Sequence, residues 1–329
     1  MWTVTHEPSL AALPQADVRE FLEGAVDEPM NLVLYGPPGA GKTAAVRALA
    51  RAAHDTTEDL VTINVADFFG LTKRELADDP RFSAFITPKR RRELSKAALI
   101  NYVLRETASY PPVTGEYKTI LLDNAEDMRE DFQHALRRVM ERHHRTTQFV
   151  LTTRRLSGLI PAIESRCVPI RVRAPTIDET VGVLEEIVAA ESVQHTDDGL
   201  EYIAGYADGN LRTAILGAQT TAVTAGEITM EAAYEALSEV GTDDEIASLL
   251  DAAEAGDFQA ARSILDDLLI DEGFSGGAIL GDILRVARSR YAGEELARLH
   301  RLAGGIDRDL AAGINERIHL SRLLAELGN

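Results

Sequence analysis

Gly36-Pro37-Pro38-Gly39-Ala40-Gly41-Lys42-Thr43 is the stretch that decides the fold expected for this chain of 329 residues. It satisfies the phosphate-loop pattern of Gly, four residues, then Gly-Lys-Thr, with an apolar run at 31–35 before it and a helical pattern at 44–53 after it. Glycines let backbone N–H groups face phosphate oxygens, and the helix N-terminus adds partial positive charge. We therefore predict that all eight residues form a nucleotide site, with Lys42 at the β- and γ-phosphates and the Thr43 hydroxyl on Mg²⁺. A chance glycine-rich turn is the alternative.

A second motif places an acid at the end of an apolar strand pattern. Thr119–Asp123 ends in Asp123, which in a Walker B arrangement holds Mg²⁺ opposite Thr43. Asn124 follows, where a hydrolytic site of this class has a carboxylate that polarises the attacking water. An amide orients a water but cannot accept its proton, so we expect ATP binding with slow or absent hydrolysis. Glu126 is the alternative base, although it should point elsewhere unless the strand has already ended.

The first half of the chain alternates short apolar runs with helical patterns, which predicts an α/β fold. Such an order favours a mostly parallel sheet with ligands at the carboxyl edge of its strands. The expected strands are 31–35, 60–65, 119–123, 148–152 and 168–172. The expected helices between them are 44–53, 97–107 and 129–142.

Pro175 marks a change of pattern, because no strand is expected beyond it. Helical patterns run over 176–190, 199–206, 211–224 and 230–237. From Gly241 onward the apolar period stays near 3.6 residues, with breaks at Gly256, Gly273–Gly277 and Gly304–Gly305. We predict three domains, namely an α/β domain over 1–174, a helical lid over 175–238 and an all-helical domain over 239–329.

The composition narrows the class of protein. Asp and Glu number 53 against 34 Lys and Arg, the net charge is -19, and the 45% apolar content fits a folded chain. Few of the basic residues are lysines, and an acid-rich, lysine-poor chain resembles proteins of salt-accumulating halophiles. An ordinary acidic enzyme is the alternative. Cys167 is the only cysteine, so no internal disulfide or Cys-based zinc site is expected. No apolar run is long enough to span a membrane, and we expect a cytoplasmic protein.

Several motifs together resemble one family. The phosphate loop, Asp123-Asn-Ala-Glu126, Ala135-Leu-Arg-Arg-Val-Met-Glu141 and Ser165-Arg166-Cys167 resemble the replication factor C small subunits, which are AAA+ clamp-loader ATPases. The overall look is closest to a divergent second small subunit of halophilic archaea, and the motifs cover residues 10–237. The resemblance implies an AAA+ P-loop NTPase domain with a parallel sheet, a helical lid and an all-helical C-terminal collar.

The resemblance also implies roles for three arginines. Arg166 matches the arginine finger that reaches a neighbouring subunit's ATP, and its planar fork suits γ-phosphate oxygens. Arg212 matches sensor 2, which brings the lid onto the γ-phosphate. An ordinary salt-bridged arginine and a helix-surface arginine are the respective alternatives. Arg154 stands where the family's sensor 1 has Asn, so it either touches phosphate or disturbs the usual geometry.

Two further positions bear on the resemblance. Gln133 matches a family Gln that links the DNA-facing helix to the Walker B acid. The segment 7–15 lacks the family's adenine-wrapping motif, so selectivity for adenine is implied by the family alone.

A local basic patch opposes the global charge. It lies in the insertion before 119–123, where the family presents helices to DNA, and its spacing can track phosphates without reading bases. A solvated charged helix face is the alternative. The residues expected at DNA are Lys89, Arg90, Arg91, Arg92 and Arg105. Three apolar residues of the same insertion, Phe82, Phe85 and Ile86, are expected in the core, with a contact to a sliding clamp as the alternative.

The function expected from these residues is that of a clamp-loader subunit in a hetero-oligomeric ring. It binds ATP and Mg²⁺, supplies Arg166 to a neighbour, and helps to load a sliding clamp onto primer–template DNA. An origin-recognition or Holliday-junction AAA+ protein is one rival, but it needs a winged helix, and the tail 304–329 has no β-hairpin pattern. A scaffold that keeps a structural nucleotide without hydrolysing it is the other.

Overall fold

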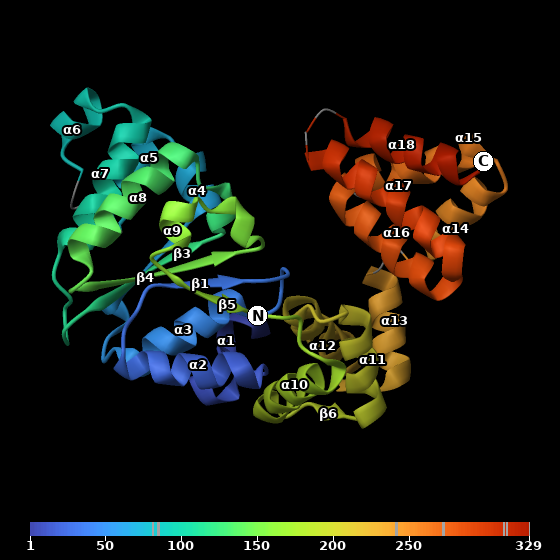
Figure 1. Cartoon of the computed structure of the whole chain (residues 1–329). Coiled ribbons are helices and arrows are strands. Elements are labelled where there is room, and N and C mark those ends of the chain that lie inside the picture. Colours follow the sequence, from blue (N-terminus) through green and yellow to red (C-terminus); the bar gives the residue numbers. More distant parts are fainter. Residues whose placement is uncertain are drawn as a thin grey trace. The chain divides into compact units, whose positions relative to one another are not determined.

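Five parallel strands form the sheet at the centre of the N-terminal part of the chain, in the order β2-β3-β4-β1-β5 (Figure 1). We describe a computed structural model for residues 1–80, 82–83, 86–240, 243–271, 274–311, 313 and 315–328. The strands are β1 (Leu32–Tyr35), β2 (Leu60–Asn64), β3 (Lys118–Asp123), β4 (Thr147–Thr153) and β5 (Val168–Arg171). All five predicted strands are confirmed to within one residue at each end. Because the strands are parallel, β1, β3 and β4 end side by side at one edge.

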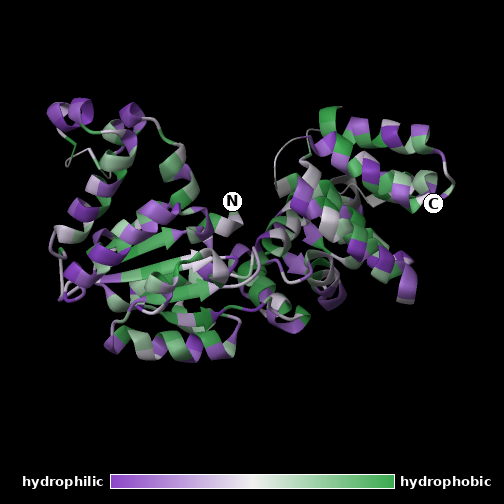
Figure 2. Cartoon of the chain, turned by 45° about the horizontal axis from the view of Figure 1, so that its top comes forward, coloured by the Kyte–Doolittle hydropathy of each residue, from purple (hydrophilic) through white to green (hydrophobic). Residues whose placement is uncertain are grey.

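Helices cover both faces of this sheet (Figure 1). On one face α2 and α3 bury Val18, Leu22 and Leu49 against Leu34 and its neighbours. On the other face α7 and α8 pack against β3 and β4. Figure 2 shows the strands coloured as largely hydrophobic between these two layers. The helices are α1 (Trp2–Thr5), α2 (Ala16–Asp27), α3 (Lys42–Ala53), α4 (Val65–Gly70), α5 (Lys73–Asp78), α6 (Pro88–Glu93), α7 (Lys96–Ser109), α8 (Glu130–His143) and α9 (Pro161–Glu164).

The predicted helical segment after Pro175 is present and adjoins the sheet domain. Thr176 begins it with a capping box, because its hydroxyl accepts the Glu179 N–H while the Glu179 carboxylate accepts the Thr176 N–H. Its helices are α10 (Ile177–Glu191), α11 (Asp197–Ala207), α12 (Leu211–Ala225) and α13 (Met230–Val240). The expectation of no strand here was wrong, since the two-residue strands β6 (Gln194–His195) and β7 (Glu227–Ile228) pair in parallel. Backbone pairs this short leave no apolar alternation in a sequence.

The chain divides into two compact units, Met1–Ala233 and Tyr234–Asn329. The C-terminal unit has its own core, in which Leu249, Leu265 and Leu323 are almost completely buried. Its helices are α14 (Asp243–Glu254), α15 (Phe258–Asp266), α16 (Gly276–Arg290), α17 (Gly293–Ala311) and α18 (Glu316–Leu327). A break at Gly256 is confirmed between α14 and α15, whereas the break expected at Gly304–Gly305 was wrong because α17 continues through it. The packing of α17 outweighs the helix cost of two glycines.

Shorter turns complete the described structure. They are the 3-10 helices η1 (Leu10–Ala12), η2 (Thr57–Asp59), η3 (Ala125–Asp127) and η4 (Leu156–Gly158), and the π-helix η5 (Asp267–Asp271).

The insertion between β2 and β3 contributes to the core. Phe82 is completely buried, with its ring 5.3 Å from that of Phe68, and Ile86 is also buried. The core interpretation is therefore confirmed for Phe82 and Ile86, and a clamp contact through their side chains is excluded. Phe85 lies outside the described residues.

Candidate nucleotide-binding site

The phosphate loop needs its glycines for conformation and for space. Gly39 and Gly41 have φ of 73° and 94°, in the left-handed region that side chains rarely adopt. A Cβ on Gly39 would lie 1.9 Å from Asn210 Oδ1, and a Cβ on Gly36 would lie 1.9 Å from the Val172 carbonyl oxygen. The loop is thus enclosed by other backbone and side-chain atoms, which a chance surface turn does not require.

Lys42 and Thr43 begin α3 directly after this loop. The Lys42 ammonium donates to the carbonyl oxygens of Gly36 at 2.9 Å and Pro37 at 2.6 Å, so it lies over the loop. Thr43 Oγ1 donates to Asp123 Oδ1 at 2.8 Å, and Thr152 of β4 donates to the same oxygen. The hydroxyl of Thr43 and the carboxylate of Asp123 are oxygen ligands of the kind that Mg²⁺ prefers. The predicted Mg²⁺ pair is therefore brought together by the ends of β1 and β3.

The lid lies against the phosphate loop through the start of α12. The Leu211 N–H donates to the Gly39 carbonyl at 3.0 Å, and Asn210 caps α12 by accepting the N–H groups of Arg212 and Thr213. Arg212 is the next residue, exposed in the first turn of α12 beside the loop. The sequence prediction missed Asn210, although Asn before a helical pattern is an N-cap signal.

Gln15 is a second contact that the sequence prediction missed. Its buried side-chain amide donates to the carbonyls of Ala40 at 2.9 Å and Arg173 at 3.0 Å. It connects the phosphate loop to the segment that leads into the lid.

The condition under which Glu126 can face the site, that the strand has already ended, is met. The strand β3 ends at Asp123, and Asn124 turns the chain through a left-handed conformation with φ of 58°, which Asn tolerates better than most residues. The 3-10 helix η3 then returns Glu126 toward the end of β4. There its carboxylate accepts the Arg154 N–H at 3.1 Å and pairs with Arg154 Nε at 3.3 Å.

The charges of this pair also act on Lys42 of the phosphate loop. Burial lowers the pKa of Lys42, the carboxylates of Glu126 and Asp123 raise it, and the Arg154 guanidinium lowers it. Asp123, Glu126 and Arg154 therefore all act on the Lys42 ammonium. The three positions lie at the shared edge of β3 and β4.

Arg166 follows α9, and its side chain is paired within the chain. Its Nε and Nη2 donate to Glu141 Oε1 at 3.0 and 2.5 Å, and Nη1 donates to the Ala162 carbonyl at 2.8 Å. One third of its side chain is exposed. No sequence signal at Glu141 indicated this ion pair. Burial raises the pKa of the neighbouring Cys167 to about 12, so this thiol is not a reactive nucleophile.

Gln133 connects α8 to the two loops that follow β3 and β4. The buried amide donates to the carbonyls of Met128 at 3.1 Å and Gly158 at 3.0 Å, and it accepts the Ile160 N–H at 2.8 Å. The loop after Gly158 leads through α9 to Arg166. One side chain thus connects the Walker B loop to the segment that carries Arg166.

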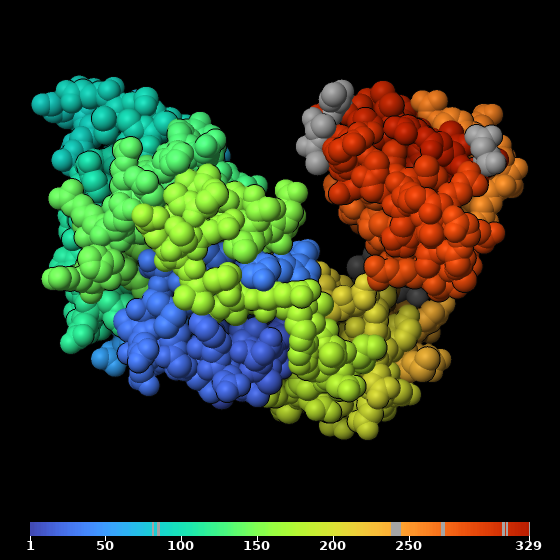
Figure 3. All heavy atoms as spheres, viewed as in Figure 1, coloured from blue at the N-terminus to red at the C-terminus, as the bar shows by residue number. Residues whose placement is uncertain are grey.

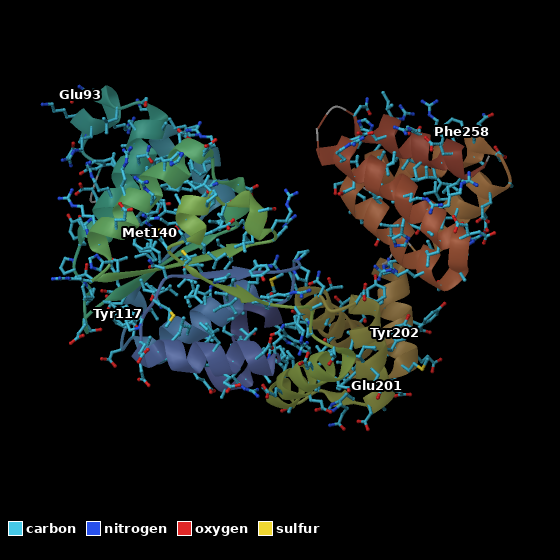
Figure 4. All side chains as sticks on the ribbon, in the orientation of Figure 1. Glu93, Tyr117, Met140, Glu201, Tyr202 and Phe258 are labelled. Atoms are coloured by element: carbon cyan, nitrogen blue, oxygen red, sulfur yellow. The ribbon has the colours of Figure 1, made fainter. Side chains whose placement is uncertain are left out.

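The basic residues of the insertion form an exposed surface around α6. Lys89, Arg90, Arg91 and Arg92 all lie on this six-residue helix and are exposed. Figure 3 shows this teal segment at an edge of the N-terminal unit, and Figure 4 labels Glu93 at the outer end of α6. The guanidinium groups of Arg90 and Arg105 lie 4.4 and 5.4 Å from the ring centre of Tyr102. Tyr102 therefore brings Arg105 to the basic residues of α6.

Comparisons with known proteins match each part of the chain to a family. The Replication factor C C-terminal domain matches residues 242–326, the RCF1/5-like AAA+ ATPase lid domain matches 182–223, and the DNA polymerase III delta subunit matches 30–176. The replication factor C small subunit of Halobacterium salinarum is 31% identical over 316 residues, covering 94% of this chain and 90% of the relative. That of Natronomonas pharaonis is 32% identical, covering 90% of this chain and 84% of the relative. This chain belongs to the replication factor C small subunit family.

Membership of the replication factor C family makes the chain an AAA+ clamp-loader subunit involved in DNA replication, with relatives in halophilic archaea. The family implies a nucleotide with Mg²⁺ and partner subunits in a hetero-oligomeric complex. The chain also resembles the family member of Archaeoglobus fulgidus, at 29% identity over 99% of this chain and 97% of the relative.

Solved structures support the AAA+ fold. The RuvB Holliday junction branch migration motor of Thermotoga maritima has a TM-score of 0.55 at 16% identity, covering 82% of this chain and 92% of that one. The Orc1 protein of Aeropyrum pernix in complex with DNA has a TM-score of 0.55 at 19% identity, covering 90% of this chain and 82% of that one. Both show the fold alone, and the C-terminal match to replication factor C separates this chain from these two rivals. Among the described residues, none of the helices combines the length and apolar character of a membrane span.

Proposed function

We propose that this replication factor C small subunit binds ATP and Mg²⁺ at the phosphate loop and supplies Arg166 to a neighbouring subunit. The observation that carries the proposal is the convergence of the loop, the Thr43–Asp123 pair and the start of α12. Backbone donors and Lys42 hold phosphates, Thr43 and Asp123 hold Mg²⁺, and Arg212 approaches from the lid. The division into an α/β domain over 1–174, a lid over 175–238 and a collar over 239–329 is part of the proposal.

Titration of the full chain with ATP in the presence and absence of Mg²⁺ tests the site. We expect Lys42→Ala to weaken ATP binding at least tenfold, because it removes the ammonium that contacts the β- and γ-phosphates. Lys73→Ala is the matched control, since Lys73 is a half-buried lysine at the start of α5, outside the phosphate loop. Equal affinities for the two variants would refute the nucleotide site.

Hydrolysis at this chain's own site is proposed to be slow, and Arg166 is proposed to act mainly on the neighbour. An amide at Asn124 accepts no proton, and Arg154 stands in the place of an amide. In the assembled complex, Arg166→Ala is expected to lower DNA-stimulated ATPase more than Asn124→Ala does. Arg145→Ala, an exposed arginine just beyond α8, serves as the control and should keep the original rate. A complex unaffected by Arg166→Ala would exclude the finger.

The ring is proposed to place a sliding clamp on primer–template DNA, with α6 and Arg105 near the phosphates. The logarithm of the DNA-binding constant falls linearly with the logarithm of the salt concentration, and each phosphate contact adds about 0.9 to the steepness of that slope. Replacing Lys89, Arg91 and Arg92 by Gln is expected to reduce that slope by about 2 to 3 in DNA binding by the assembled complex. Replacing Arg298, Arg301 and Arg322 of the C-terminal unit by Gln provides a control of equal charge. An unchanged slope in the α6 variant would mean that these residues form a solvated charged helix face and do not contact DNA phosphates.

A further inference from the structure

The pair formed by Glu126 and Arg154 is held by two different kinds of contact. One carboxylate oxygen accepts the Arg154 backbone N–H at 3.1 Å, and the other lies 3.3 Å from Arg154 Nε. The Glu126 side chain is only 11% exposed, whereas that of Arg154 is 64% exposed. The carboxylate is therefore fixed by backbone, while the guanidinium has room to move into solvent.

The location of the pair is defined by its neighbours. Glu126 and Arg154 follow the ends of β3 and β4, the two strands that also supply Asp123 and Thr152. Asp123 also accepts the hydroxyl of Thr43 at 2.8 Å, so the residues that close the phosphate loop lie at the same strand ends. The Glu126–Arg154 pair therefore lies at the strand ends that hold the proposed nucleotide site.

Glu126 and Arg154 can each do something that Asn124 cannot: Glu126 can accept a proton, and Arg154 can pair with an anion. The Asn124 amide cannot accept a proton from water, whereas the Glu126 carboxylate can. An anionic phosphate competes with Glu126 for the exposed guanidinium, since Arg pairs with either oxyanion through the same planar fork. When the guanidinium leaves, the backbone N–H of Arg154 still holds Glu126 in place.

We propose that Glu126 is the general base of this site and that Arg154 exchanges Glu126 for the γ-phosphate of bound ATP. The inference rests on the nucleotide site proposed above. In the step, the water oxygen bonds to the γ-phosphorus and its proton passes to the Glu126 carboxylate. The bond from the γ-phosphorus to the bridging oxygen breaks, and that electron pair leaves with ADP, giving ADP and phosphate. The ion pair must open before the proton moves, which keeps hydrolysis slow.

Nucleotide binding tests the exchange without relying on activity. In equilibrium titrations of the full chain, Arg154→Ala is expected to weaken the affinity for ATP at least fivefold. The affinity for ADP should change less than twofold, because ADP has no γ-phosphate. Arg155→Ala, the adjacent exposed arginine, is the control and should change neither affinity. Equal changes for ATP and ADP, or none, would overturn the exchange. Failure of the original chain to bind ATP at all would instead refute the proposed nucleotide site.

Single-turnover hydrolysis tests the base. It is measured in the assembled complex after the phosphate-loop lysines of the partner subunits have been replaced, so that only this chain binds ATP. Glu126→Gln keeps an oxygen for the Arg154 N–H and is expected to lower the rate at least 100-fold while ATP affinity stays within twofold. Asp127→Asn, an exposed neighbour, should leave the rate unchanged. A normal rate for Glu126→Gln, or no hydrolysis by an original site that binds ATP, would overturn the role of Glu126.

Discussion

Gly39 of the phosphate loop is contacted by the lid, since its carbonyl accepts the Leu211 N–H. Its φ of 73° and the Asn210 side chain both exclude a Cβ. Gly39→Ala is therefore expected to lower the free energy of unfolding by about 1–3 kcal/mol, through left-handed strain and displacement of Asn210. Denaturant unfolding measures the change.

Gly182 of α10 provides the matched control for that change. It has an ordinary helical conformation, and nothing lies within 4 Å of a Cβ placed on it. Gly182→Ala is expected to raise the free energy of unfolding by about 0.5–1 kcal/mol because Ala restricts the unfolded chain and favours the helix. Equal effects of the two substitutions would contradict this account of the loop.

Lys118 is a buried charge at the start of β3, and it gives a pH-dependent prediction. Burial lowers its pKa to about 8 from 10.5, against the opposing effect of Asp59. Between these values the folded chain holds a neutral Lys118 while the unfolded chain keeps its proton, so stability rises with pH. Relative to Lys118→Met, the original chain should gain up to about 1.4 kcal/mol per pH unit within that window.

Urea unfolding of both chains at pH 7 and pH 9.5 measures the gain. The comparison cancels the titration of groups that the two chains share. A stability difference that stays constant, or that moves in favour of Lys118→Met as pH rises, would show that the lysine keeps its proton in the folded chain.

At the scale of elements, Gln133 determines how α8 is joined to the loops after β3 and β4. Its buried amide satisfies two backbone carbonyls and one N–H. Gln133→Ala leaves those groups without their partner and is expected to cost about 2–4 kcal/mol of unfolding free energy. Thermal or urea unfolding of the variant measures this cost, and His134→Ala, on the exposed face of the same helix, should cost less than about 0.5 kcal/mol. Similar costs for the two variants would mean that water replaces Gln133.

The elements also show how far sequence patterns reach. Strands β1 to β5 were predicted closely because buried parallel strands read as short apolar runs between helical patterns. The orientation of Glu126 was left open by the sequence, because it depends on where β3 ends and on Asn124 adopting a left-handed conformation directly after it. Successive side chains point to opposite faces of a sheet only while the strand continues, so this rule cannot place a residue that follows the end of the strand.

At the scale of the whole molecule, the two compact units should respond differently to nucleotide. A ligand at 100 times its Kd stabilises the state that binds it by about 2.7 kcal/mol. Amide hydrogen exchange with ATP and Mg²⁺ should slow in the cores of Met1–Ala233 and change little in Tyr234–Asn329. With Lys42→Ala at the same ATP concentration, the slowing should be lost. Equal slowing in both units would show that nucleotide binding is coupled to the C-terminal helices.

The net charge of -19 gives a second prediction at this scale. At about 1 M salt the Debye length falls to about 3 Å, which screens repulsion among exposed carboxylates more than it weakens close ion pairs. The melting temperature of the full chain should therefore rise as KCl increases from 0.1 M to 2 M. A fall would mean that surface ion pairs of the arginines outweigh the repulsion.

Short motifs and local apolar periodicity were enough to predict the phosphate loop, the Walker B acid, the parallel sheet and the family resemblance. Which side chains meet across distant segments became known only from the folded structure. Glu126 meets Arg154, Glu141 meets Arg166, and Asn210 meets the loop at Gly39. Such contacts are set by where a strand stops and how the next turn is directed, and these depend on packing between segments that no local pattern records.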